Sequence, residues 1–258
     1  MASSFPRPAL AAALAFALMP AAGEAAPNRP PVEAASPAAA EDPAYGELFA
    51  AMLDSADQQA AYDGIAASIA REYAKVPEIA ALEAAKPGLI AAIVTGLRPA
   101  LVSYGDRVRA QYRPRMLAAF ARHLSPAEAR DIAELYRSPI GRKLMAAMSR
   151  NVTADSVVSG IGTAMAEGKD PNAVEVSRSQ VEADMRRATA SAMGELTPAD
   201  FEALGQMARN KPALFKLNLV RGDIMQLRTA MENEPPTPDE EKRIEAAVIA
   251  AMTAHMGG

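Results

Sequence analysis

This 258-residue chain has no cysteine and only two histidines, and the spacing of its reactive residue types matches no standard reactive site. Cysteine is absent, which excludes disulfides, thiol catalysis, iron–sulfur clusters and cysteine-bound zinc. His123 and His255 do not lie at metal-motif spacing, and we expect each to be a partly buried or surface histidine; a site completed by carboxylates from elsewhere in the fold stays open. There is no Gly-x-Ser-x-Gly, His-Glu-x-x-His or phosphate-binding glycine loop. These absences favour a protein that is not an enzyme, with a hydrolase as the less favoured alternative.

Two further sets of side chains could do chemistry, and ordinary structure explains both. Glu128, Asp131 and Glu134 form a carboxylate cluster, but their spacing also fits charges on the surface of one helix. Methionines could hold Cu(I) or a small ligand, because thioethers are soft and adaptable. Their spacing follows the apolar faces of the predicted helices, so we expect core packing and no metal or cofactor. These methionines are Met116, Met145, Met148, Met165 and Met207.

Basic residues concentrate in the middle of a chain whose net charge is −4. Positions 98–150 hold 11 basic and 4 acidic residues. This block could bind an anionic surface, namely lipid headgroups, a cell-wall polymer or an acidic partner, or it could pair with the acidic helices on either side or sit solvated. Pairing or solvation is the favoured interpretation, because basic blocks on helices commonly form surface salt bridges. The interaction surface that we predict comprises Arg115, Arg137, Ser138, Gly141, Arg142 and Lys143.

The basic block surrounds a stretch, Leu124 to Met148, that predicts two short helices joined at a sharp bend. Ser125 is a good N-cap, the proline after it suits the first helical position, and Glu128 completes a capping box. Ser138-Pro139 repeats the signal, because this proline cannot continue the first helix but can begin a second. Gly141 would leave room there for a neighbouring backbone.

The bend also carries a resemblance to a known family. The segment from Tyr136 to Lys143, YRSPIGRK, resembles the aromatic-Tyr-x-Ser-Pro-x-Gly-x-Lys hallmark of bacterial exported proteins grouped as domain of unknown function 2059. Leu135 departs from that pattern, since the family usually has an aromatic residue there. The resemblance covers Arg98 to Met148, and it implies an all-helical exported domain with no established activity and no catalytic residues. The matching residues are Tyr136, Ser138, Pro139, Gly141 and Lys143.

A second stretch repeats the pattern of the first. Leu196 to Leu217, LTPADFEALGQMARNKPALFKL, aligns with Leu124 to Leu144, LSPAEARDIAELYRSPIGRKL, if one residue is inserted at Lys211. Seven of 21 aligned positions are identical, and a threonine and an aspartate replace the capping serine and glutamate. The pattern indicates either duplication of a helical unit or two independent uses of a common helix-start signal. The identical pairs include Pro126/Pro198, Pro139/Pro212 and Lys143/Lys216.

The remaining apolar residues recur at helical spacing, so we expect an all-α bundle of short amphipathic helices. Half of the residues are apolar but only 5% are aromatic, and alanine, the strongest helix former, is abundant. Pro114 is expected to kink or restart its helix. A weaker helix is predicted from Asn151 to Glu167. Heptad spacing from Ala213 to Met231 is too short for a free coiled coil and predicts packing inside the domain.

The N-terminus predicts export. Arg7 supplies a positive charge, Ala9 to Met19 forms an apolar run, and Gly23-Glu24-Ala25 offers a cleavage site after Ala25. The run is too short to span a membrane comfortably, and there is no cysteine to carry a lipid, so we expect a periplasmic or secreted protein without a transmembrane anchor. The predicted organisation is a signal peptide at 1–25, a Pro/Ala-rich tether at 26–43, a helical unit containing the bend at 44–150, and a second helical unit packed on it at 151–258.

The function expected from the sequence is that of a non-enzymatic exported binding module, or an accessory protein of the cell envelope, with a basic face. Its partner would be an envelope protein or an anionic surface, and nucleic acid is disfavoured by export and by an acidic isoelectric point. The alternative is a carrier for a small ligand or amphiphile.

Overall fold

Helix-favouring composition produces helices in every part of the chain that can be described. The computed structural model describes residues 41–151, 160, 163 and 174–257, and these ranges contain helices and turns but no strand. The predicted all-α fold class is therefore confirmed. The signal peptide, nearly all of the tether and most of the helix predicted from Asn151 to Glu167 lie outside the described residues. The helices are α1 (Pro43–Asp54), α2 (Gln58–Tyr73), α3 (Pro77–Ala85), α4 (Leu89–His123), α5 (Pro126–Arg137), α6 (Pro139–Arg150), α8 (Arg178–Gly194), α9 (Pro198–Asn210), the 3₁₀ helix η4 (Pro212–Lys216), α10 (Leu217–Glu232) and α11 (Pro238–Gly257).

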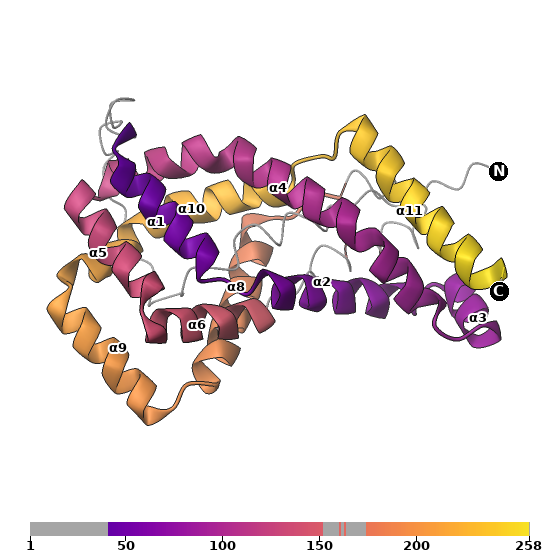
Figure 1. The fold of residues 1–258 in the computed structure, drawn as a ribbon, viewed down its shortest axis with the longest axis horizontal. Helices are drawn as coiled ribbons and strands as arrows, with labels where there is room; N and C mark the ends of the chain where they lie inside the picture. Colours follow the sequence, from indigo (N-terminus) through magenta and orange to yellow (C-terminus); the bar gives the residue numbers. More distant parts are fainter. Residues whose placement is uncertain (1–40, 152–159, 161–162, 164–173, 258) are drawn as a thin grey trace.

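One long helix, α4, organises this arrangement (Figure 1). α11 lies along one half of it and α10 along the other, and α1, α2 and α3 contact it as well. Pro99 and Pro114 lie inside α4, which runs unbroken from Leu89 to His123, so a restart at Pro114 is wrong. Each proline removes one backbone donor, and the packing of neighbouring helices along α4 offsets that loss.

Small residues let α11 approach α4 closely. An ideal Cβ built on Gly96 would lie 3.1 Å from the Cβ of Ala251 and 3.4 Å from the carbonyl oxygen of Ala247. A charged contact joins the same two helices nearer the start of α11. There Arg107 Nε lies 3.0 Å from a carboxylate oxygen of Glu240, which is only 4% exposed.

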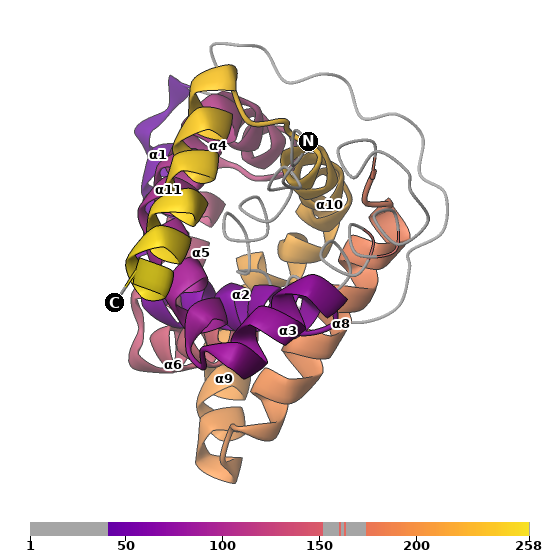
Figure 2. The same cartoon turned by 90° about the vertical axis from the view of Figure 1, so that its right-hand side faces the viewer.

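The core continues from α4 into the stretch that holds the predicted bend. α1 packs along α5, and the buried Tyr45 hydroxyl donates to the carbonyl oxygen of Leu124 at 2.7 Å, just before α5 begins. Figure 2, turned by 90°, shows α4 and α11 on one side of the molecule and α8 on the other. Apolar residues of the α10 heptad pattern, Val220, Ile224 and Met231, are buried, which confirms that this pattern packs inside the fold.

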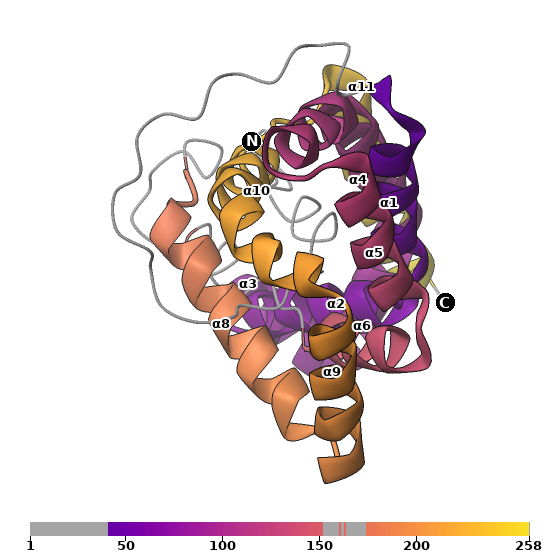
Figure 3. The same cartoon turned by 90° about the vertical axis from the view of Figure 1, so that its left-hand side faces the viewer.

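α9 is the exception to this burial. It contributes no buried residue, and together with α8 it forms a V that projects from the rest of the molecule (Figure 3). Its packing partners are α6 and η4. Within the described ranges no single helix has the length and apolar composition of a membrane span; α3 and α4 reach it only together, across a bend of 115°.

Candidate functional site

The bend predicted at Ser138-Pro139 is built on one shared cap. Ser138 Oγ accepts the N–H of Gly141 at 3.0 Å, at the start of α6, and donates to the carbonyl oxygen of Leu135 at 2.6 Å, at the end of α5. Pro139 occupies the first position of α6, where a missing N–H costs no hydrogen bond. One serine therefore ends one helix and begins the next. We call the segment from Ser138 to Lys143 the corner.

Gly141 is required by the sharpness of the corner. The residue is buried, and an ideal Cβ built on it would lie 1.8 Å from the carbonyl oxygen of Leu135 and 2.7 Å from that residue's carbonyl carbon. Backbone atoms cannot move aside as the end of a flexible side chain can. Only glycine therefore fits where the start of α6 passes the end of α5.

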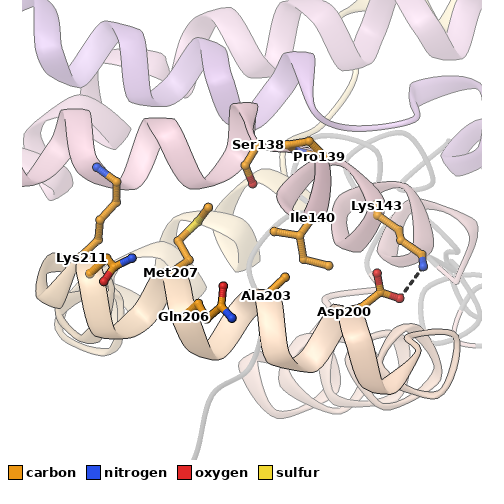
Figure 4. Close-up of a pocket in the computed structure, with 10 residues that line it drawn as sticks. Ser138, Pro139, Ile140, Lys143, Asp200, Ala203, Gln206, Met207 and Lys211 are labelled. Atoms are coloured by element: carbon orange, nitrogen blue, oxygen red, sulfur yellow. Dashed lines mark hydrogen bonds and ion pairs between the residues drawn. The ribbon is translucent and has the colours of Figure 1, made fainter.

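A groove of about 540 Å³ separates the corner from α9 (Figure 4). Pro139 and Ile140 form an apolar wall on the corner side, and Ala203 and Met207 face them from α9. The side-chain amides of two further α9 residues, Gln206 and Asn210, border this apolar wall. We call this space the corner groove. Its described lining residues are Ser138, Pro139, Ile140 and Lys143 from the corner, with Asp200, Ala203, Gln206, Met207, Asn210 and Lys211 from α9 and the residue after it.

Ion pairs lie at both ends of the corner groove. At one end Lys143 pairs with Asp200, and this ammonium, together with Thr197, lowers the pKa of Asp200 to about 2. At the other end the ammonium of Lys211 lies 2.8 Å from Asp131 and 2.5 Å from Glu134 on α5, and these carboxylates raise the pKa of Lys211. Both lysines are therefore already neutralised by carboxylates of the same chain.

The structure separates the residues of the predicted interaction surface. Ser138 and Lys143 line the corner groove, whereas the backbone of α5 covers Gly141. Arg137 and Arg142 are exposed neighbours, since Arg142 donates to the carbonyl oxygen of Arg137. Arg115 lies apart from them: its guanidinium is 5.3 Å from the centre of the Tyr112 ring, and the hydroxyl of that tyrosine donates to Glu234 in the turn after α10.

Most of the basic block pairs inside the molecule. Seven of its 11 basic residues lie within 4.0 Å of a carboxylate, namely Arg98, Arg107, Arg109, Arg122, Arg130, Lys143 and Arg150. The other four, Arg113, Arg115, Arg137 and Arg142, have no carboxylate partner within the described ranges. More residues of the basic block are therefore paired with carboxylates than are left without a carboxylate partner on an open basic face.

The histidines do not form a common site. His123 Nε2 lies 3.0 Å from Asp223, at the C-terminal end of α4. His255 Nε2 lies 3.3 Å from the carbonyl oxygen of Lys86, beside the start of α4. By the rise of a 35-residue helix the two are about 50 Å apart. No group of three or more histidines and carboxylates in the described part of the chain could hold a metal ion.

The methionines follow the prediction with one correction. Met116, Met145 and Met148 are buried in the core, as predicted. Met207 is not in the core but lines the corner groove, because α9 buries none of its residues. Met165 lies outside the described residues.

The α9 side of the corner groove was missed by reasoning from the sequence. Ala203, Gln206 and Asn210 are small or polar residues on a helix, and nothing in their types singles them out. The available signal was the repeated pattern, which places α9 in register with α5. The repeated pattern indicates a shared groove only when the structure shows that the two copies lie in contact.

Comparisons with known proteins identify the region that carries the corner. Searches of curated proteins and of solved structures found no match. Residues 111–167 match the family described as "Uncharacterized protein conserved in bacteria (DUF2059)". This match contains the whole of Tyr136 to Lys143, so the resemblance stated for that segment is confirmed: residues 111–167 of this chain are similar to the DUF2059 family.

Proposed function

We propose that this chain is a non-enzymatic binding protein that holds a small amphiphilic molecule in the corner groove. The observation that carries the proposal is the groove itself. Its volume of about 540 Å³ falls in the range of small-molecule sites, and its apolar wall is bordered by a few polar groups, which is the usual chemistry of such sites.

The polar groups of the groove support binding over catalysis. Asp200 is held ionised by Lys143, and the ammonium of Lys211 is held by two carboxylates, so neither is poised to move a proton near neutral pH. Ser138, the one hydroxyl among the described lining residues, is engaged as the shared cap of two helices. These groups can orient a ligand, and their existing bonds oppose a catalytic role.

The chain is proposed to act outside the cytoplasm, in the periplasm or as a secreted protein. The support is the N-terminal sequence, with its positive charge, short apolar run and small residues before Ala26. Expression in a Gram-negative host followed by cell fractionation tests this proposal. We expect a periplasmic product whose N-terminal residue is Ala26; an intact N-terminus in the cytoplasmic fraction would contradict export.

Binding can be tested with the neutral fluorescent amphiphile N-phenyl-1-naphthylamine, whose emission rises in apolar surroundings. We expect the purified mature protein to bind it and Ala203→Trp to weaken binding about tenfold or more, because the indole would fill the groove. Ala208→Trp is the matched control, since Ala208 lies on the same helix but does not line the groove. Equal loss in both variants, or none in either, would contradict a site in the corner groove.

A second candidate function is attachment to an anionic surface, such as an envelope protein or lipid headgroups. It is favoured by three arginines that have no carboxylate partner in the described ranges. Two of them lie against α1, and the third contacts one of these two. Arg113 rests 5.9 Å from the centre of the Phe49 ring, Arg137 points to the carbonyl oxygen of Glu47, and Arg142 contacts the backbone of Arg137.

Charge reversal distinguishes this candidate from groove binding. Arg137→Glu with Arg142→Glu should abolish retention on vesicles that contain anionic lipid, while binding of N-phenyl-1-naphthylamine stays unchanged. Lys143 is left intact in this test because its reversal would break the pair with Asp200. Retention that is unchanged in the folded double variant would remove the candidate.

A further inference from the structure

The two stretches that repeat in sequence also repeat in local structure. α5 and α9 both begin with a proline, and both carry a complete capping box, formed by Ser125 with Glu128 and by Thr197 with Asp200. Each helix ends just before a second proline that begins the next helical segment, α6 in one stretch and η4 in the other. The shared pattern thus extends from the first cap to the corner.

The ion pairs between the two stretches are crossed. Lys143 of the first stretch binds Asp200, the capping-box acid of the second. Lys216, which aligns with Lys143, lies 2.6 Å from Glu128, which aligns with Asp200. The helix contacts cross in the same way, because α6 packs on α9 and η4 packs on α5. Reciprocal contacts of this kind are the signature of two like units paired around a two-fold axis.

The pairing differs on its two sides at one point. On the α5 side the inserted residue Lys211 places its ammonium between Asp131 and Glu134. On the α9 side the aligned residues are Ala203 and Gln206, and the first stretch has no counterpart of Lys211. On the α5 side, the ammonium of Lys211 fills the space beside the two carboxylates. The corresponding space on the α9 side, beside Ala203 and Gln206, is part of the corner groove.

We propose that the two stretches are duplicated units paired around a local two-fold axis, and that the corner groove binds a small neutral molecule with an amide head and a short apolar tail. This rests on the proposed function of the groove and specifies its ligand. The counterpart site accepts a cation because it offers two carboxylates, and the groove has lost both. Its own carboxylate, Asp200, is occupied by Lys143 and Thr197.

The lining residues match such a ligand on both of its ends. The side-chain amides of Gln206 and Asn210 can each donate and accept hydrogen bonds, as an amide head requires. Ile140, Pro139 and Met207 provide the apolar surface for a tail. An anionic head is disfavoured, because both lysines at the ends of the groove are already paired with carboxylates.

Three six-carbon ligands with different heads test this specificity: hexanamide, hexylammonium and hexanoate. Each is titrated against the mature protein loaded with N-phenyl-1-naphthylamine. We expect hexanamide to displace the probe at about a tenfold lower concentration than either charged ligand. The variant A203D/Q206E, which installs the two acids of the α5 side, should reverse the order and favour hexylammonium about tenfold.

The control and the outcomes separate the two proposals. Ala208→Asp adds a charge to α9 outside the groove and should keep the preference for hexanamide. If the wild-type protein does not bind the probe, the proposed function fails and the ligand assignment with it. If the probe binds but the three heads compete equally, or A203D/Q206E keeps the wild-type order, only the ligand assignment is overturned. Q206E alone, at an exposed position, replaces the double variant if that variant does not fold.

Discussion

Two buried tyrosine hydroxyls in this core differ in their hydrogen bonding. Tyr45 and Tyr136 are both almost fully buried, and burial raises the pKa of each phenol, so both stay neutral. The Tyr45 hydroxyl donates to Leu124, whereas that of Tyr136 has no partner among the described residues. Tyr136 is thus retained for its ring, consistent with a core role for the aromatic residue next to the corner.

We therefore expect the same substitution to change the free energy of unfolding differently at these two positions. Tyr45→Phe should lower the free energy of unfolding by about 1–2 kcal/mol, because it leaves the Leu124 carbonyl without its buried donor. Tyr136→Phe should be neutral or slightly stabilising, within about 0.5 kcal/mol. Chemical denaturation followed by circular dichroism measures both. A comparable loss in Tyr136→Phe would show that its hydroxyl has a partner.

Gly141 sets the geometry of the corner, so alanine should not be tolerated there. We expect Gly141→Ala to cost about 3 kcal/mol, since its Cβ would overlap backbone atoms of Leu135 and force α6 away from α5. Gly222→Ala is the matched control, because Gly222 lies inside α10 with nothing within 4 Å of an added Cβ. That change should stabilise by about 0.5–1 kcal/mol. Thermal melts of both variants decide the point.

At the scale of elements, α9 is held mainly by contacts at its ends. It buries no residue, and its capping-box acid is paired with Lys143. The pKa of Asp200 in the folded protein is about 2, below its ordinary value of 3.8, first because of Lys143 and then because of Thr197. This ionised contact therefore stabilises the folded position of α9 above about pH 4 and is lost as the pH falls through 2.

We expect amide hydrogen exchange in α9, corrected for the intrinsic rate, to increase between pH 4 and pH 2 more than exchange in α5. Asp200→Asn should already show the faster exchange at pH 5 and should lose most of the further change on acidification. Glu202→Gln, on the same helix but outside the groove, serves as the control. Equal acid sensitivity in wild type and Asp200→Asn would show that another carboxylate controls α9.

The helices could be predicted from the sequence because their signals are local. Ser125 with Glu128, and the proline after Ser138, specify helix starts within a few residues, and the structure places both starts as expected. The unbroken α4 was not predictable in this way, because packing by α10 along this half of α4 overrides the local effect of Pro114. The corner groove depends on a contact between residues about 60 positions apart, and periodicity within one helix carries no information on that contact.

At the scale of the whole molecule, most of the basic residues at positions 98–150 form ion pairs with carboxylates of the same chain. Arg107 on α4 reaches Glu240 at the start of α11 and the carbonyl oxygen of Pro235, and it lies 3.6 Å from Glu234. Burial alone would raise the pKa of Glu240, but the N–H of Thr237 and the guanidinium of Arg107 lower it. One arginine therefore fixes the turn between α10 and α11 against the central helix.

Removing the contacts of Arg107 should destabilise the C-terminal half of the fold. We expect Arg107→Met to lower the free energy of unfolding by about 2–3 kcal/mol, because Glu240 is 4% exposed and would be left charged without its cation. Adding Glu240→Gln should recover about 1 kcal/mol or more, since glutamine is neutral and can still complete the capping box with Thr237. Arg115→Met, on the same helix and without a carboxylate partner in the described ranges, should cost less than about 1 kcal/mol. Denaturation curves that gave Arg107→Met and Arg115→Met the same cost would mean that the contact with Glu240 contributes nothing to the position of α11.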